Sequence, residues 1–184
     1  MRRTAVLQGA GVLALLVAIV GLFLWLNPPA TGTTSSVTLD EPAGTLPEIG
    51  APAPGFTATT IEGEEFRLSD LQGRPVWVVV NATWCTSCRS EIPDIQQIAQ
   101  SELGDEVEIL SVYLGEDTPT VTEFAERLGL TYTNVPDPGK GISQAYAVPA
   151  IPVHYFIDPH GVLQAIEIGT IGHSQMVSHL ESLR

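Results

Sequence analysis

A continuous apolar segment runs directly into two cysteines in the stretch Val76-Trp77-Val78-Val79-Val80-Asn81-Ala82-Thr83-Trp84-Cys85-Thr86-Ser87-Cys88. These are the only two cysteines in the 184-residue chain. A structural zinc site usually requires four ligands, often from two such pairs. Two thiols between a strand-like and a helix-like segment are better suited to electron transfer, because they can close into a disulfide and reopen by thiolate attack. The stretch predicts a redox site, with a static disulfide or half of a metal site as alternatives.

Strand-like and helix-like patterns alternate on both sides of the cysteines. Val76–Asn81 is a β-branched, apolar run that fits a strand buried on both faces, and 89–102 places isoleucines at roughly helical spacing. Thr118 before Pro119 is typical of an N-cap and a first helical residue, and Gly129 is expected to end that helix. Further predictions are strands at 107–113, 153–157 and 162–168, helices at 141–146 and 174–183, and an N-terminal hairpin of 56–60 with 65–68. This order predicts an α/β domain with a mixed central β-sheet flanked by helices.

The first 26 residues are predicted to form a membrane anchor. Ala5–Leu26 is almost wholly apolar and as a helix reaches about 33 Å, against a hydrocarbon core of about 30 Å. Arg2 and Arg3 precede it and the next basic residue is Arg67, so the positive-inside rule leaves the N-terminus in the cytoplasm. A cleaved signal peptide is the alternative, although its apolar core is usually about 7–15 residues. Either way, the remaining chain is expected on the extracytoplasmic face of the cytoplasmic membrane.

Composition separates the rest of the chain into two regions. Residues 27–49 are rich in Pro, Thr, Ser and Gly, which predicts a flexible linker. Residues 50–184 carry the strand and helix patterns and are expected to form the compact domain. The chain holds 21 acidic and 8 basic residues, a formal net charge of −13. Such a surface repels nucleic acid, so no nucleic-acid partner is expected.

Four separated motifs follow one another through the compact region. They are Gly50-Ala51-Pro52-Ala53-Pro54-Gly55-Phe56, Leu68-Ser69-Asp70-Leu71-Gln72-Gly73-Arg74-Pro75, Ala82-Thr83-Trp84-Cys85-Thr86-Ser87-Cys88-Arg89-Ser90-Glu91-Ile92-Pro93, and Tyr146-Ala147-Val148-Pro149-Ala150-Ile151-Pro152. In this order they resemble the thioredoxin superfamily, and most closely its membrane-anchored TlpA/ResA/DsbE-like branch of thiol–disulfide oxidoreductases. The resemblance implies a thioredoxin-like fold from about Gly50 to the C-terminus. The chain departs from the pattern at Ser87, where proline is usual.

The resemblance also implies roles for the two cysteines and for an acid near them. Cys85 is expected to be the exposed attacking nucleophile just before a helix, where amides and the helix dipole stabilise a thiolate. Cys88, one turn in and more buried, is expected to resolve the mixed disulfide. Glu91 lies on the same side of the helix. In the resembled branch an acid here lies beneath the active site, where it can raise thiol pKa values and relay protons; a solvated helix glutamate is the alternative.

Residues around the disulfide are expected to bind the substrate. Trp84, Thr86 and Ser87 flank the cysteines, with core packing as the alternative role for Trp84. Pro152 resembles the family's cis-proline, and Pro149 competes for that assignment. A cis Pro152 is expected to leave the backbone of Ile151 free to pair with a substrate strand.

The function that the resemblance implies is extracytoplasmic exchange of the Cys85–Cys88 dithiol with the cysteines of exported proteins, as a reductant. The usual branch client is apocytochrome c, and a membrane electron donor of the DsbD/CcdA type is expected to recharge the protein. No organic cofactor is expected, because the disulfide itself carries the electrons, and a monomer is expected. Two alternatives remain: a disulfide-forming oxidase, and a copper-binding metallochaperone that uses the two thiols with a histidine such as His154.

Overall fold

The computed structural model describes residues 16–22, 25, 37–39 and 47–184, which belong to two units, Met1–Gly32 and Thr33–Arg184. In the first unit, residues 16–22 and 25 are helical. Most of the anchor predicted over 1–26 lies outside the described residues. Within the described ranges, no helix is both long enough and apolar enough to cross a membrane.

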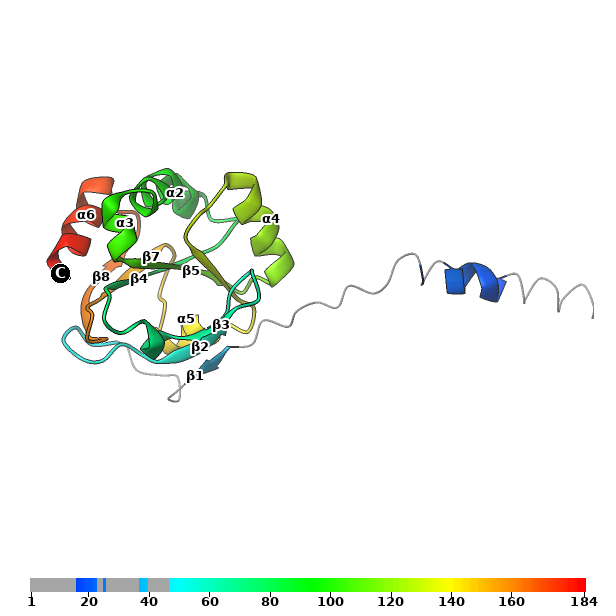
Figure 1. Ribbon diagram of the computed structural model, residues 1–184, viewed down its shortest axis with the longest axis horizontal. Helices are drawn as coiled ribbons and strands as arrows, with labels where there is room; N and C mark the ends of the chain where they lie inside the picture. Colours follow the sequence, from blue (N-terminus) through cyan, green and yellow to red (C-terminus); the bar gives the residue numbers. More distant parts are fainter. Residues whose placement is uncertain (1–15, 23–24, 26–36, 40–46) are drawn as a thin grey trace, which may run out of the picture. The chain divides into compact units, whose positions relative to one another are not determined.

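The second unit is built around a five-stranded mixed sheet in the order β6-β5-β4-β7-β8 (Figure 1). Its strands are β4 (Val76–Asn81), β5 (Glu108–Leu114), β6 (Thr133–Asp137), β7 (Val153–Ile157) and β8 (Leu163–Ile168). The first three run parallel, whereas β7 pairs antiparallel with both β4 and β8. The carboxyl ends of β4 and β5 therefore lie at one edge of the sheet, and the cysteines directly follow β4.

One face of the sheet is covered by α2 (Thr86–Ala99), α4 (Thr118–Leu128) and α6 (His173–Ser182), and the short α3 (Glu102–Glu106) follows α2 (Figure 1). Side chains on this face form one apolar cluster from β4, β7, α2 and α6, which includes Trp77, Val79, Phe156, Ile95, Ile98, Met176 and Leu180. Cys88, Glu91, Ile95 and Ile98 are the buried residues of α2. Their spacing of three, four and three places Glu91 on the face that packs on the sheet.

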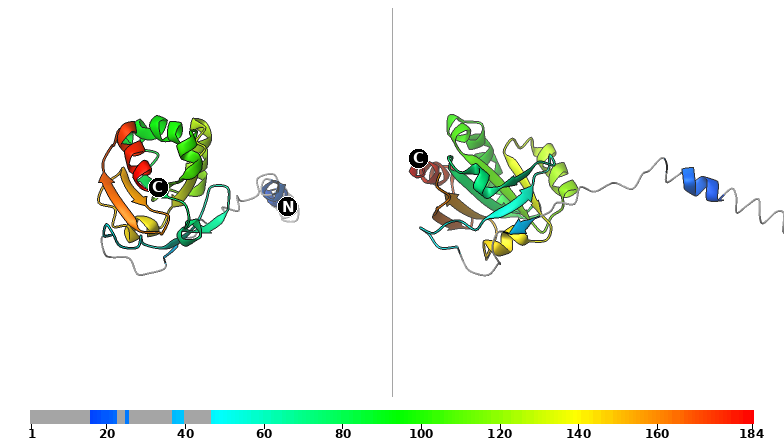
Figure 2. Two further views of the ribbon diagram at one scale, coloured as in Figure 1. Left: turned by 60° about the vertical axis from the view of Figure 1, so that its left-hand side comes forward. Right: turned by 60° about the horizontal axis from the view of Figure 1, so that its bottom comes forward.

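The other face is covered by a small antiparallel sheet and by α5 (Gly141–Ala145). The small sheet has the order β1 (Thr38–Leu39), β2 (Phe56–Thr59), β3 (Glu65–Arg67). It lies below the main sheet in Figure 1, and Figure 2 shows the same domain from two other directions. The pairing of β2 with β3 confirms the predicted N-terminal hairpin. Strand β1 falls within the range predicted as a linker, so this part of 27–49 pairs with the sheet. The order and layers are those of the thioredoxin-like fold that the resemblance implied.

Three local predictions were wrong for identifiable reasons. Strand β6 was not predicted because Asn134, Pro136 and Asp137 are poor strand formers; it is an edge strand, where proline is tolerated. Helix α2 begins before Arg89 because Cys85 caps it. The N-cap of α4 is Asp117, whose carboxylate accepts a hydrogen bond from the Thr120 N–H at 3.1 Å.

Asp137 joins β6 to α5, and its burial predicts a pH-dependent stability. Its side chain is fully buried and accepts hydrogen bonds from the Ser143 N–H (2.9 Å), the Ser143 hydroxyl (2.7 Å) and the Ile142 N–H (3.3 Å). Burial raises the pKa of Asp137 above 3.8 despite these donors. The folded state thus holds the proton more tightly than the unfolded chain, so stability falls as pH rises from about 4 through the raised pKa.

We expect Asp137→Asn to remove this fall, because the amide does not ionise. Each unit by which the folded pKa is raised corresponds to about 1.4 kcal/mol of lost stability. Urea unfolding at a series of pH values above 4 measures the effect, with the exposed Asp70→Asn as the control. Parallel stability curves for the wild type and Asp137→Asn would show that this carboxyl does not control the pH dependence.

Candidate active site

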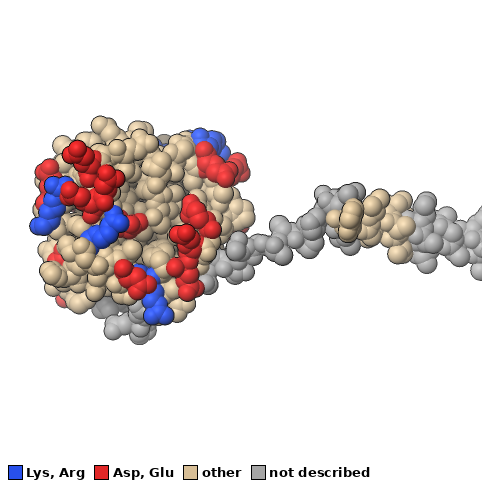
Figure 3. Space-filling view, viewed as in Figure 1, with Lys and Arg blue, Asp and Glu red and all other residues tan. Residues whose placement is uncertain are grey.

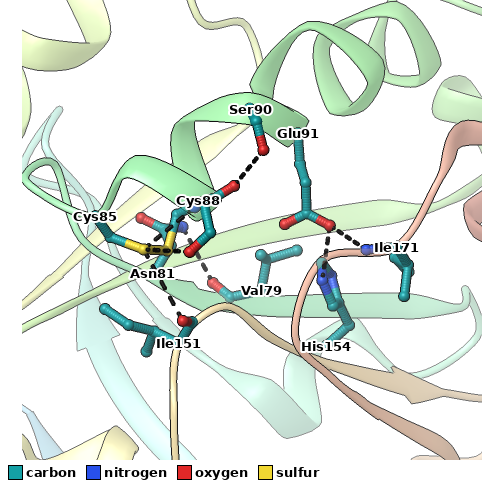
Figure 4. A network of polar contacts seen from close by, with 10 residues as sticks. Val79, Asn81, Cys85, Cys88, Ser90, Glu91, Ile151, His154 and Ile171 are labelled. Atoms are coloured by element: carbon teal, nitrogen blue, oxygen red, sulfur yellow. Dashed lines mark hydrogen bonds and ion pairs between the residues drawn. A yellow bond between two sulfur atoms is a disulfide. The ribbon is translucent and has the colours of Figure 1, made fainter.

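The two cysteines form a disulfide at the start of α2, with an S–S distance of 2.12 Å and a Cα–Cα distance of 5.3 Å (Figure 4). Cys85 is the N-cap of the helix, and its Sγ accepts a hydrogen bond from the Cys88 N–H at 3.2 Å. The Ser87 hydroxyl lies 3.4 Å from the same sulfur and is the donor, because a disulfide sulfur carries no proton. These donors and the helix dipole favour a thiolate at Cys85 once the bond opens.

Cys85 is buried in the closed disulfide, which corrects the prediction of an exposed nucleophile. Its exposed fraction is 6%, against 4% for Cys88. The cause is the packing of Ala82 and Ile151 against the disulfide. The residues that flank Cys85 in the sequence are open to solvent: Trp84 is 67% exposed, and Thr86 and Ser87 are also exposed. The high exposure of Trp84 excludes ordinary core packing for that side chain.

The loop before β7 faces the disulfide. The Ile151–Pro152 peptide bond is cis, which is the conformation that the resemblance implied for Pro152 rather than Pro149. The Ile151 carbonyl oxygen lies 3.9 Å from Cys85 Sγ. The Pro152 carbonyl accepts a hydrogen bond from the Gly169 N–H at 2.8 Å, which ties the loop to the end of β8. The loop and the helix start therefore meet at Cys85, although their residues are 66 positions apart.

Glu91 is buried beneath the helix start, so the alternative of a solvated glutamate is wrong. Its exposed fraction is 2%. One carboxylate oxygen, Oε1, accepts a hydrogen bond from the Ile171 N–H at 2.6 Å and lies 3.3 Å from His154 Nε2. Figure 4 shows Glu91 and Cys88 on the same helix, with His154 reaching Glu91 from β7.

His154 does not form a joint site with the two sulfurs. It is fully buried and lies against Glu91, Trp77 and Phe156. Among the described residues, no group of three or more His, Cys, Asp or Glu side chains could hold a metal ion. The histidine that the metallochaperone hypothesis assigned to the thiols therefore belongs to a different cluster.

Glu116 is a residue of the site that the sequence analysis missed. It follows β5 and is 9% exposed. Its two oxygens accept hydrogen bonds from the Thr83 N–H at 2.8 Å and from the Thr83 hydroxyl at 2.6 Å. Thr83 lies two positions before Cys85, so Glu116 fixes the turn that leads into the disulfide. The sequence did contain a signal for Glu116. Strands β4 and β5 are parallel, so the polar residues that follow each strand meet at one edge of the sheet.

The arrangement can accept and return two electrons. The Cys85 sulfur caps the N-terminus of α2, and the second sulfur lies one turn further in. The exposed Trp84 directly precedes Cys85, and the Ile151 carbonyl oxygen lies 3.9 Å from its sulfur. The buried carboxyl of Glu91 lies three residues after the second cysteine, on the same face of α2. These are the parts that thiol–disulfide exchange needs, because that reaction proceeds by thiolate attack through a mixed disulfide.

Comparisons with known proteins agree with this chemistry. The model of the AhpC/TSA family matches residues 49–166. The thiol-disulfide oxidoreductase ResA of Geobacillus kaustophilus is 37% identical over 136 residues, which cover 74% of this chain and 78% of that protein. The thioredoxin-like protein YneN of Bacillus subtilis is 32% identical over 170 residues, covering 91% and 94%.

A solved structure extends the likeness to the fold. A secreted Mycobacterium tuberculosis disulfide oxidoreductase, homologous to E. coli DsbE, superposes with a TM-score of 0.62 at 25% identity, over 69% of this chain and 95% of that chain. The family model covers more than half of the chain, and the relatives match along most of their own length. The chain therefore belongs to the AhpC/TSA family, in which it is a thiol–disulfide oxidoreductase of the ResA and DsbE type.

Proposed function

We propose that the protein is tethered to the outer face of the cytoplasmic membrane and reduces disulfides in exported proteins. The observation that carries the redox part is the Cys85–Cys88 disulfide at the start of α2. The tether is supported by the sequence of 1–26 and by the large apolar side chains of its described helical residues. Each of these is more than half exposed: Leu16, Val17, Ile19, Val20 and Leu22. Contiguous exposed apolar side chains are typical of a membrane or protein contact.

A client is proposed to bind as an extended segment alongside Ile151. The Ile151 carbonyl makes no backbone hydrogen bond within the described ranges, so it can pair with a client strand in the manner of β-addition. Trp84, which directly precedes Cys85, offers an open aromatic surface. Because Cys85 is only 6% exposed, a narrow, unfolded client segment is favoured over a folded surface. The client cysteine would then lie beside Cys85, between Trp84 and the loop.

The proposed reaction transfers two electrons to the client. The Cys85 thiolate attacks the client disulfide, forms a mixed disulfide and releases one client thiolate. The Cys88 thiolate then attacks Cys85 Sγ, closes the Cys85–Cys88 bond and releases the second client thiolate. A membrane electron donor of the DsbD/CcdA type would reduce the disulfide again. The proposed clients are exported proteins with cysteine pairs, including apocytochrome c, and the proposed working form is a monomer without an organic cofactor.

Surface charge supports a protein client over nucleic acid. On the face shown in Figure 3, acidic groups lie over much of the domain, with a few basic groups among them. The net charge of −13 opposes binding to a phosphate backbone. An unfolded, basic client segment would be attracted to such a surface at low ionic strength.

A disulfide-forming oxidase is the second candidate, and one contact favours it. The Ser87 hydroxyl and the Cys88 N–H both donate toward Cys85 Sγ. Donors of this kind stabilise a thiolate and hence the reduced form, which makes a couple more oxidising. The buried Glu91 acts in the opposite direction, because a nearby negative charge disfavours a thiolate. The balance of these two effects decides the direction of electron flow.

We expect the couple to be reducing, with a reduction potential at or below the value of about −270 mV typical of thioredoxin. Equilibration of the full chain with dithiothreitol mixtures of known ratio measures it. The reduced chain should then reduce an apocytochrome peptide whose two cysteines are joined, and leave a peptide with serines in their place unchanged. A potential near that of the strong oxidant DsbA, about −120 mV, together with oxidation of the reduced peptide, would favour the oxidase instead.

A further inference from the structure

The buried pair of Glu91 and His154 has more hydrogen-bonding capacity than its surroundings satisfy. Glu91 is 2% exposed and His154 is fully buried. Their nearest atoms, Oε1 and Nε2, are 3.3 Å apart. Glu91 Oε2 and both ring nitrogens of His154 are buried without a hydrogen-bonded partner in the described part of the protein. Unsatisfied buried polar atoms are costly, so a pair of titratable groups kept in this state calls for a functional explanation.

A second carboxylate–imidazole pair continues the row from His154 to the surface. His154 on β7 is directly opposite Glu167 on β8, and opposite residues of an antiparallel pair project on the same face with Cβ atoms about 5 Å apart. The Glu167 carboxylate lies 3.0 Å from His179 Nε2 on α6. These two side chains are 34% and 24% exposed. Acid and imidazole groups thus alternate from α2 through β7 and β8 to solvent.

The groups that face His154 come from four elements. Glu91 reaches it from α2 and Glu167 is opposite it on β8. Strand β4 contributes Val79 as its cross-strand partner and the Trp77 ring at 5.8 Å, neither of which titrates near neutral pH. The ring also lies 6.4 Å from Phe156, at an interplanar angle of 18°, and Phe156 in turn stacks on His179 at 4.4 Å. The apolar rings exclude water from the pair and leave the carboxylates as its proton partners.

We propose that His154 shares a proton with Glu91, and that Glu167 and His179 connect this pair to solvent. The proposal rests on the proposed thiol–disulfide exchange and assigns its proton route. His154 is a positioning and proton-sharing residue, since it acts through Glu91 and does not reach the sulfurs.

The route is used when Cys88 attacks. In the reduced protein, the buried Cys88 thiol must lose its proton before its sulfur can displace the client from Cys85. Glu91, three residues further along the helix, accepts that proton. His154 shares the proton with Glu91 and so takes up the positive charge. The Cys88 thiolate then closes the disulfide, and the departing client sulfur leaves with the electron pair. The proton passes by Glu167 and His179 to water, so the pair returns to its starting state.

A two-step reaction of the full chain with dithiobis(nitrobenzoate) tests the route. Attack by Cys85 releases the first coloured thiolate, and attack by Cys88 on the mixed disulfide releases the second. We expect His154→Phe, His154→Asn and Glu91→Gln to slow the second release at least about tenfold, since general acid–base catalysis typically contributes 10²–10⁴-fold. The pH profile of the second release should change in each variant, and the second release should slow more than the first.

Matched variants separate proton transfer from packing. His154→Phe keeps an aromatic ring beside Trp77 and Phe156, so a wild-type rate and pH profile in this variant would overturn the role of His154. If the two residues form one route, Glu91→Gln combined with His154→Phe is no slower than the slower single variant.

A separate pair of variants tests the outer part of the route, which consists of Glu167 and His179. Glu167→Gln should slow the second release and alter its pH profile, in contrast to Glu181→Gln, which changes an exposed carboxylate further along α6. Identical behaviour of these two variants would remove Glu167 and His179 from the route. Failure of the wild type to release either thiolate would instead count against the proposed function itself.

Discussion

Replacement of Cys85 by serine should abolish exchange, whereas replacement of Cys88 by serine should stop the reaction at a covalent mixed disulfide. The assignment follows from the helix start: Cys85 is the N-cap and lies beside Ser87 and Ile151, while Cys88 is inside the first turn. A serine hydroxyl at position 85 is not ionised near neutral pH, so the rate should fall by more than about 1,000-fold. Without Cys88, the client has no internal thiolate to displace it from Cys85.

Mass spectrometry of the full chain mixed with a disulfide-bonded peptide measures both outcomes. Cys88→Ser should gain the mass of one peptide, and dithiothreitol should release it. Cys85→Ser should gain nothing. The reverse pattern, with trapping only in Cys85→Ser, would make Cys88 the nucleophile and contradict the geometry. A conservative control is Ser90→Ala, since the Ser90 hydroxyl donates to the Ser87 carbonyl at 2.6 Å rather than to a sulfur, so this variant should exchange normally.

The parts of the fold that could be predicted are those whose position in the fold determines their residue types directly. Strands β4 and β7 lie inside the sheet and are buried on both faces, so each consists mainly of large apolar residues, with His154 as the exception in β7. Gly129 adopts a left-handed conformation, with φ of 63°, at the end of α4, as its position in the sequence indicated. Edge strand β6 has no such apolar sequence, and its Pro136 and Asp137 are compatible with a loop as well as with an edge strand.

The parts of the site that could not be predicted depend on contacts between distant segments. The burial of Cys85 is produced by Ile151, which belongs to another loop. Glu91 is fixed by the amide of Ile171, 80 positions away. Helical periodicity placed Glu91 on the side of Cys88, but it could not tell whether that side faced water. Only the fold shows that the loop before α6 closes over this carboxyl.

Loss of the Glu116 carboxylate should both destabilise the domain and slow exchange. Both of its oxygens are used by Thr83, at 2.8 Å and 2.6 Å, and it is 9% exposed. Glu116→Ala leaves the Thr83 N–H and hydroxyl without acceptors in a part-buried site. An unsatisfied buried donor costs about 1–3 kcal/mol, so we expect about 2–4 kcal/mol for the pair. The freed turn should also misplace Cys85, because the turn ends two residues before that sulfur.

Urea unfolding and the rate of the first thiolate release measure these two effects in one set of variants. Glu126→Ala on α4 is the matched control, since that side chain is exposed and should change stability by less than about 0.5 kcal/mol. Thr83→Val removes only the hydroxyl donor, so in a double-mutant cycle with Glu116→Ala it should show a coupling energy of about 1 kcal/mol or more. Additive effects of the two substitutions would mean that the carboxylate stabilises the chain elsewhere. A slower exchange in Glu116→Ala at unchanged stability would mean that its main effect is on the position of Cys85, through the turn that carries it.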